Sequence, residues 1–554
     1  MKRVFVGSEE TGIFGELMIS EEKTKLYAQI NLKVGLEVHQ QLSTQTKLFC
    51  ACPPYSGSES SIVIGSKETD SRFPIRFTRI LRASSSELGE MDLAARFEAR
   101  REIRVQYLTN NDSSCLVEAD EEPPHPINEE ALSTSLIFAL ALKSRIIDEI
   151  HVMRKIVVDG SNTSGFQRTA VVALGGMLEY NSGHSRIQVQ SISVEEDAAR
   201  AVKIDSANSN ERTYILDRLG TPLVEVALAP IEGSPEEVQA AAGSLGRLMR
   251  SSGRIARGLG TIRQDLNVSV RGGNVIEVKG VQKLDQIAKV VEFEAARQDF
   301  FYELAIEIKT RLGDDLDIST GEVTDLFKES KSNVIKNALS GGRDSKVFCV
   351  MIKGFAGFLG KENAFHSRLG KELGSVAKAY GLGGIFHSDE LPNYGVTSDE
   401  VAKTKSKFGL GLRDAFILLA GNSSKVANAS EAVLARLRYS LKGVPAETRA
   451  ATLDGETSFL RPRPGAARMY PETDIPLIRT TKEQIQELQK QIPEPWDKLV
   501  KEFGERYKLP PQLAIQLFES ERKESFELAV RKTNLSPGFL AYSLVDTLQS
   551  LSRE

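Results

Sequence analysis

Four short segments carry carboxylates at positions where an ordinary soluble protein has few of them. In three of these segments the acid interrupts alternating apolar residues, so its side chain points either into a core or into a cleft. An unpaired charge in a core is strongly disfavoured, which makes a shared cleft the better interpretation. The segments are VGLEVHQQL (34–42), SVEEDAA (193–199), IRQDLNVSV (262–270) and VIEVKG (275–280). Together they predict a site for a metal ion and a nucleotide.

Glu37 and His39 are two residues apart in an alternating segment, so both side chains leave the same face of a strand. A carboxylate and an imidazole on one face form a usable pair of metal ligands. A surface salt bridge explains the pair equally well. The pair alone leaves both interpretations open.

The segments around Asp265 and Glu277 predict a hairpin, joined by the turn RGGN (271–274). Asp265 shares one strand face with Asn267, and Glu277 shares one with Lys279. A two-residue loop would put Asp265 and Glu277 on opposite faces, whereas a loop with an odd number of residues puts both polar faces together. We therefore expect a three-residue or bulged hairpin with a glycine at positive φ. The alternative is a solvated sheet face.

The acidic triplet Glu195, Glu196 and Asp197 adds further oxygen ligands. Because consecutive strand residues point in different directions, one acid is expected to reach a metal and another an arginine. An isolated acidic triplet is usually a solvated strand end. With the acids and the histidine named above, however, it completes an oxygen-rich set that suits Mg²⁺ or Mn²⁺ better than zinc.

Other chemistries have weaker support. Cys50 and Cys52 form only half of a zinc site, and Cys115 has no matching partner in the sequence. GFAGFLGKE (354–362) differs from a phosphate-binding loop in its glycine spacing and has Glu362 in place of a serine or threonine. The candidate phosphate-holding side chains are instead Arg154, Lys155, Gln167, Arg168, Arg254, Arg257 and Arg263.

Local patterns predict the elements that must position these residues. A capping box with proline at the first helical position (234–237) starts one helix, and 285–312 has apolar residues at helical spacing. The most apolar stretch, 132–142, is expected to form a buried helix. A Gly- and Ser-rich break at 339–345 predicts the start of a new unit, which a helix over 431–443 closes.

Composition sets the broad class. With 554 residues the chain is too long for one ordinary core, so about two to four domains are expected. The net charge of −4 neither favours nor excludes nucleic-acid binding. We find no apolar run of the ~20 residues needed to span a bilayer and no export signal. Four cysteines are too few for a disulfide framework, which favours a reducing, cytoplasmic location.

Several of these segments, together with others, resemble the E-type subunit of the archaeal glutamyl-tRNA(Gln) amidotransferases, which is related to the bacterial B-type subunit. The segments that carry the resemblance are GLEVHQQLSTQTKLFC, LVEADEEPPHP, RKIVVDGSNTSGFQRT, LDRLGTPLVEV, GLGTIRQDLNVSV, EVKGVQ and RMYPETDIP. It covers about residue 31 to the end of the chain. The acidic loop 117–126 and an insertion at about 345–445 resemble the E-type rather than the B-type.

The resemblance implies an α+β multidomain fold. It consists of a strand-rich catalytic (cradle) domain, an inserted α/β domain resembling that of bacterial-type aspartyl-tRNA synthetases, and a C-terminal helical domain. The expected parts are an N-terminal extension (1–30), the catalytic domain (31–344), the insertion (345–445), a return to the catalytic domain (446–480) and the helical domain (481–554). The further tail domain of the family is expected to be absent.

For function, the resemblance implies a two-step ligase reaction with ATP and Mg²⁺ as cofactors. ATP phosphorylates the side-chain carboxylate of the glutamate esterified to tRNA(Gln), and ammonia then displaces the phosphate to give glutaminyl-tRNA(Gln). An asparaginase-like D-type subunit supplies the ammonia, in a heterotetramer with two copies of each chain. Two alternatives stay open, namely a bacterial-type amidotransferase chain of the B-type and a non-catalytic tRNA-binding relative.

The resemblance also assigns residues. Glu37, His39 and Glu196 would hold one Mg²⁺ with Glu195 close by, and Asp265 and Glu277 would receive the metal that accompanies ATP. The residues assigned to catalysis are Glu37, His39, Asp265 and Glu277. Those assigned to nucleotide or substrate binding are Lys155, Gln167, Arg263 and Lys279.

Overall fold

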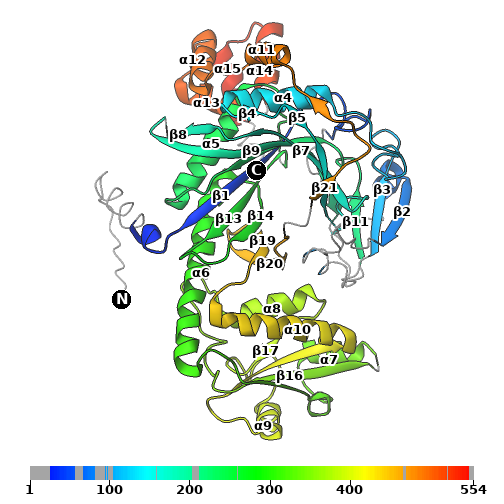
Figure 1. Ribbon diagram of the computed structural model, residues 1–554, viewed down its shortest axis with the longest axis vertical. Coiled ribbons are helices and arrows are strands. Elements are labelled where there is room, and N and C mark those ends of the chain that lie inside the picture. The colour runs from blue at the N-terminus through cyan, green and yellow to red at the C-terminus, as the bar shows by residue number, and fades with distance from the viewer. Residues whose placement is uncertain are drawn as a thin grey trace.

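The structure of the protein is a computed structural model. It describes residues 25–55, 67–80, 94, 97, 104–157, 159–181, 183–202, 211–258, 260–342, 344–465, 469–520 and 522–547. Most of the expected N-terminal extension, residues 1–24, lies outside these ranges. The molecule is a mixed α/β multidomain protein with one large sheet and several C-terminal helices (Figure 1).

The large sheet runs through the middle of the molecule (Figure 1). Its main path is β20 (Thr457–Pro462), β19 (Glu447–Ala451), β14 (Ile276–Val281), β13 (Ile262–Ser269), β1 (Lys33–Gln41), β12 (Pro222–Leu228), β9 (Ser185–Glu196), β7 (Phe166–Leu174), β6 (Val152–Ile156) and β21 (Met469–Pro471). β4 (Arg145–Ile146) pairs with β7, and β8 (Met177–Tyr180) pairs with β9. Among these described strands β14 and β19 run parallel, and the other recorded pairs are antiparallel.

One face of the large sheet is covered by helices. α4 (Glu129–Ala141), α5 (Pro235–Ser251) and α6 (Leu284–Leu312) share one core with the inward side chains of β1. The three helices confirm the predictions from sequence, and α5 begins with the expected capping box. Because residues alternate between faces, burying one face of β1 leaves Glu37 and His39 on the other face.

The hairpin of β13 and β14 has the register that the odd-numbered loop requires. Asn267 pairs with Glu277, so the ladder is centred on Gly272, which has a φ of +69°. The register then shifts between Gln264 and Leu266, which marks a bulge. The expected shared polar face and the positive-φ glycine are confirmed, and the loop between the strands is longer than three residues.

A second unit contains the sheet β15 (Ile318–Glu322), β16 (Ser345–Ile352), β18 (Ala415–Asn422) and β17 (Phe386–His387), with helices α7 (Asn333–Ser340), α8 (Leu369–Ala379), α9 (Ser398–Lys407) and α10 (Ser423–Tyr439). We call it the inserted unit. The expected boundary at 345 lies inside it, because β15 pairs with β16. The Gly-rich break is a loop between α7 and β16. The closing helix starts at Ser423, earlier than the expected 431.

α6 extends from the large sheet to the inserted unit, which lies at the opposite end of the molecule from the C-terminal helices (Figure 1). After the inserted unit the chain returns to the large sheet through β19, β20 and β21. A short pair, β22 (Ile478–Arg479) with β5 (Glu149–Ile150), follows. A separate sheet contains β10 (Arg200–Val202), β11 (Glu211–Ile215), β3 (Arg104–Thr109) and β2 (Ile75–Ile80).

The C-terminal helices are α11 (Lys482–Gln489), α12 (Trp496–Tyr507), α13 (Pro511–Glu519), α14 (Lys523–Lys532) and α15 (Pro537–Tyr542). The last four form a core of their own around Trp496, Phe503 and Phe526, whereas Leu488 of α11 packs into the main core. The expected run of amphipathic helices after Thr481 is confirmed, with Thr481 as the N-cap of α11. Within the described part of the chain, no helix has the length and apolar character that crossing a membrane requires.

Candidate active site

The uncovered face of the large sheet carries a row of acids and a histidine on adjacent strands. Glu37 of β1 lies opposite Asp265 of β13, and His39 lies opposite Glu225 of β12. Directly opposed residues project to the same face of a sheet. The register alone therefore brings these four side chains together.

His39 is the centre of the row. Its Nε2 lies 3.2 Å from a carboxylate oxygen of Glu225 and 3.9 Å from one of Glu195, and the side chain is 11% exposed. Burial lowers the pKa of His39, but the hydrogen bond to Glu225 and the charges of Glu225, Asp265 and Glu195 raise it by more. Its Nδ1 is buried and has no hydrogen-bond partner among the described residues.

Two overlapping ligand sets share this histidine. Glu37, His39 and Asp265 form one set, and His39, Glu195 and Glu225 form the other; in each set the ligand atoms lie within 4.8 Å of one another. Burial, followed by the charges of Glu225 and Asp265, raises the pKa of Glu37. Oxygen-rich sets with one imidazole suit Mg²⁺ or Mn²⁺. The unpartnered Nδ1 and the crowded carboxylates fit a bound divalent cation.

The hairpin side chains join the same site. Lys279 Nζ lies 2.9 Å from a carboxylate oxygen of Asp265 and 2.9 Å from one of Glu277. Burial raises the pKa values of both acids, but the charge of Lys279 and the hydrogen bonds to them lower both below the usual range. Asn267 donates to Glu37 across 2.8 Å. The predicted face of Asp265, Asn267, Glu277 and Lys279 is therefore assembled.

Lys155 and Gln167 lie on the neighbouring strands β6 and β7 and are paired with each other across them. Lys155 Nζ donates to Glu195 Oε1 at 2.6 Å, and Gln167 Nε2 donates to Glu195 Oε2 at 3.1 Å. Both residues, which the sequence analysis assigned to nucleotide or substrate binding, thus border the ligand set at Glu195.

Glu196 does not join this set. Its carboxylate accepts from the backbone N–H of Arg168 at 3.0 Å and faces the Arg168 guanidinium at 3.3 Å. Glu195 and Glu196 are consecutive on β9, so their side chains leave opposite faces. The geometry does not place Glu196 beside Glu37 and His39, as the sequence analysis expected. Glu195 is the acid of the triplet that lies beside His39.

Asp197 meets an arginine, as one member of the triplet was expected to do. Arg263 Nη1 donates to Asp197 Oδ1 at 2.9 Å, and Gln41 donates to the other oxygen at 2.7 Å. Arg263 lies opposite His39 in the sheet. The guanidinium assigned to the nucleotide therefore borders the site while its charge is paired with Asp197.

A family model described as the GatB/GatE catalytic domain matches residues 32–486, which include both the large sheet and the inserted unit. The chain belongs to the GatB/GatE family.

Relatives of this GatB/GatE chain are similar over nearly its whole length. A protein of Methanocaldococcus jannaschii, named as the E subunit of glutamyl-tRNA(Gln) amidotransferase, is 45% identical over 530 residues, which are 95% of this chain and 81% of the relative. The protein of the same name from Aeropyrum pernix is 45% identical over 536 residues, 95% of this chain and 80% of the relative. The protein of the same name from Saccharolobus solfataricus is 43% identical over 535 residues, which are 94% of this chain and 80% of the relative.

Glu225 is the ligand candidate that the sequence analysis missed. It lies in PLVEVAL, an alternating apolar strand with a single acid. The charge of Lys155 and the hydrogen bond from His39 outweigh its burial and lower the pKa of Glu225 well below the usual range. The same pattern that identified Glu37 and Glu277 was therefore present in the sequence at Glu225.

A second group of potential ligands lies apart from these acids. Cys50, Cys52, Cys115 and Glu118 each offer an atom within 4.8 Å of the others. Cys50 Sγ lies 2.8 Å from Glu118 Oε1, and a hydrogen bond from the Cys50 thiol lowers the pKa of Cys52 to about 7. Cys115 shows no matching pair in the sequence, but folding brings it to Cys50 and Cys52. Three thiols and a carboxylate are donors that Zn²⁺ accepts.

Proposed function

We propose that this GatB/GatE chain is the component of a tRNA-dependent amidotransferase that converts Glu-tRNA(Gln) to Gln-tRNA(Gln). The observation that supports this most strongly is its similarity, over 94–95% of its length, to proteins named as the E subunit of glutamyl-tRNA(Gln) amidotransferase. The reaction joins ammonia to the glutamyl side chain at the expense of ATP. In the first step the γ-phosphoryl group passes to the side-chain carboxylate and ADP leaves. In the second, ammonia attacks the acyl carbon and phosphate leaves.

The acids around His39 fit the first step. A bound Mg²⁺ would neutralise the charge that develops on the phosphoryl oxygens. We assign its ligands to Glu37, His39 and Asp265, with Glu195 and Glu225 on the other side of the histidine. The ligand atoms lie within 4.8 Å of one another in each of these two sets, and the strand register holds them there. Glu277, which Lys279 joins to Asp265, is proposed as a further ligand, of the metal that accompanies ATP.

The cations around these acids have separate roles in the proposal. Lys279 neutralises Asp265 and Glu277, which lets both carboxylates stay ionised beside each other. Lys155 and Gln167 fix the Glu195 carboxylate by hydrogen bonds to its two oxygens. These side chains position charge, which is the main requirement of phosphoryl transfer.

Ammonia is proposed to come from a separate chain. An asparaginase-like D-type subunit would release it, and two copies of each chain would form the assembly. The inserted unit is proposed to correspond to the extra domain of bacterial-type aspartyl-tRNA synthetases and to contact the tRNA. The place of action is the cytoplasm, where the aminoacyl-tRNA substrate is made.

The experiment that tests this function is ATP consumption by the purified chain with Mg²⁺. Three reactions are compared, containing Glu-tRNA(Gln), uncharged tRNA(Gln) or no tRNA. Hydrolysis is expected only in the reaction that contains Glu-tRNA(Gln), because only that substrate offers the glutamyl side-chain carboxylate that ATP phosphorylates. Equal hydrolysis in all three reactions, or none when the ammonia-supplying chain is also present, would contradict the proposal.

A further inference from the structure

Glu277 has a neighbour that arrives from a distant part of the sequence. β19, the first strand after the inserted unit, pairs in parallel with β14 and sets Thr448 directly beside Glu277. Thr448 Oγ1 donates to Glu277 Oε2 at 2.6 Å. Thr448 is 0% exposed, so this hydrogen bond has no competition from water.

This hydrogen bond fixes the orientation of the carboxylate. One oxygen of Glu277 faces Lys279 at 2.9 Å and the other accepts from Thr448. With both oxygens engaged in different directions, the carboxylate plane is defined by two partners on two strands. Partners behind a metal ligand commonly control its affinity through such orientation.

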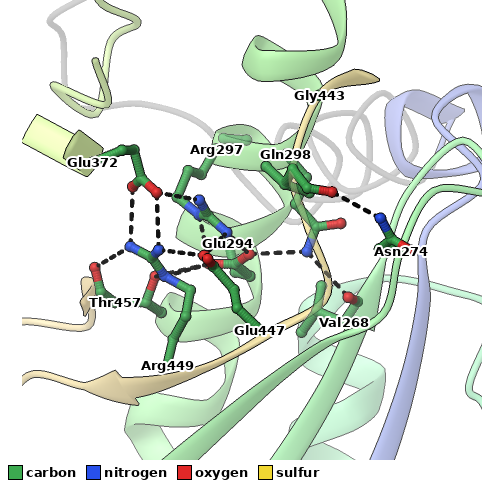
Figure 2. Close-up of polar contacts among 12 residues, drawn as sticks. Val268, Asn274, Glu294, Arg297, Gln298, Glu372, Gly443, Glu447, Arg449 and Thr457 are labelled. Atoms are coloured by element: carbon green, nitrogen blue, oxygen red, sulfur yellow. Dashed lines mark hydrogen bonds and ion pairs between the residues drawn. The ribbon is translucent and has the colours of Figure 1, made fainter. Parts of the chain in front are cut away.

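The residues on either side of Thr448 point to the opposite face of β19. Glu447 and Arg449 enter a group of five buried, ion-paired side chains, which we call the buried ion cluster (Figure 2). Its members are Glu294, Arg297, Glu372, Glu447 and Arg449. All five are buried. Strand alternation thus makes β19 contact the site on one face and the cluster on the other.

The cluster joins different parts of the fold. Glu294 and Arg297 come from α6, which packs on the large sheet, whereas Glu372 comes from α8 of the inserted unit (Figure 2). Glu372 accepts from Arg297 at 3.0 Å and from both terminal nitrogens of Arg449 at 3.0 and 3.1 Å. Arg436 of α10 is buried close by, and its charge helps to lower the pKa of Glu372. The inserted unit therefore binds β19 directly beside Thr448.

We propose that Thr448 is a positioning residue for Glu277, and that the buried ion cluster holds Thr448 in place by fixing β19 to the inserted unit. This inference rests on the metal site proposed above and names the residues that hold one of its carboxylates in position. In this arrangement the inserted unit maintains the geometry of the carboxylates in addition to any contact it makes with a substrate. A disturbance of its docking on β19 reaches Glu277 through one hydrogen bond.

The test measures Mn²⁺ binding to the full chain by the electron paramagnetic resonance signal of free Mn²⁺. Asp265→Ala defines the part of the binding that belongs to the site. Thr448→Val removes the hydroxyl at almost constant volume and is expected to weaken that binding about 10- to 100-fold. Thr448→Ser keeps the donor and is expected to stay within about threefold of the wild type. Rescue by serine separates positioning from simple loss of packing.

A matched control removes a buried hydroxyl elsewhere. Thr404 is also 0% exposed and donates to the backbone of its own helix α9, so Thr404→Val is expected to leave Mn²⁺ binding unchanged. Mn²⁺ affinity that Thr448→Val leaves intact would overturn this inference alone. A wild type that binds no better than Asp265→Ala would overturn the metal assignment and the inference with it.

A double-mutant cycle tests the role of the cluster. Glu372→Gln does not touch the site, yet it is expected to weaken Mn²⁺ binding about 2- to 30-fold. In the Thr448→Val background the same change is expected to have less than about a twofold effect, because the hydrogen bond that transmits it is gone. Equal effects of Glu372→Gln in both backgrounds, or no effect in either, would show that the cluster does not support Thr448.

Discussion

Replacing Glu372 with glutamine isolates the contribution of one buried charge to the docking of the inserted unit. The substitution keeps the size of the side chain but removes one of the three carboxylates that Arg297 and Arg449 share, leaving them with Glu294 and Glu447. Burial raises the pKa of Glu372, but the charges of Arg297, Arg449 and Arg436 lower it further, to about 2 from the usual 4.5. That difference corresponds to about 3 kcal/mol of stability at neutral pH. Removing one partner of a buried ion pair costs about 3–5 kcal/mol, which agrees in size.

The effect depends on pH in a defined direction. The pKa of Glu372 is lower in the folded state, so its contribution is complete above about pH 4.5 and is lost as the pH falls towards 2. Between pH 7 and pH 4 the difference between wild type and Glu372→Gln is expected to shrink by roughly 1 kcal/mol. A variant whose effect grows on acidification would contradict the assigned ionisation.

Hydrogen exchange followed by mass spectrometry is the appropriate assay, because the only tryptophan, Trp496, lies in the C-terminal helices. In Glu372→Gln, peptides from α8 and β19 are expected to exchange faster than in the wild type, because the free energy of opening is about 3 kcal/mol smaller. The fluorescence of Trp496, which reports on the unfolding of the C-terminal helices, serves as an internal control. Its unfolding transition should be the same in Glu372→Gln as in the wild type. Glu456→Gln is the matched control, since Glu456 forms an exposed ion pair with Lys371 of the same helix as Glu372, worth about 1 kcal/mol or less. Equal protection of α8 in Glu372→Gln and in the wild type would refute the reasoning.

Three further outcomes are expected. Asp265→Ala should abolish ATP hydrolysis that depends on Glu-tRNA(Gln) while leaving the thermal unfolding transition in place; retained hydrolysis would remove Asp265 from the metal site. Glu225→Gln should weaken Mn²⁺ binding about 10- to 100-fold, because His39 loses the carboxylate that orients its ring; an unchanged affinity would limit Glu225 to a structural role. The purified chain should contain about one zinc ion, measured by elemental analysis, and Cys115→Ser should lower that content; a zinc-free wild type isolated without chelators would count against the thiol site.

Much of the candidate site could be predicted from sequence because it is built from strands of the large sheet. Alternation alone placed Glu37 and His39 on one face, and an odd loop around Gly272 placed Asp265 and Glu277 together. These inferences need only the geometry of a strand and a turn. They hold because burial of the opposite face fixes the register.

Contacts between distant segments could not be predicted in the same way. The partners of Glu372 lie on α6 and β19, and their charges resemble a solvated helix face or a strand end when each is seen alone. Cys115 likewise meets Cys50 only through the fold. The boundary of the inserted unit was misplaced for the same reason, since the pairing of β15 with β16 leaves no local mark in the sequence.

The central claim is that this chain contains the site where the glutamyl side chain is activated and amidated. The most direct measurement supplies Glu-tRNA(Gln), labelled in its glutamate, with ATP, Mg²⁺ and ammonium chloride in place of an ammonia-producing chain. After hydrolysis of the aminoacyl ester, the label is expected in glutamine, and Asp265→Ala is expected to leave it in glutamate. Label that stays in glutamate with the wild-type chain, although the tRNA binds and ATP is present, would contradict the account.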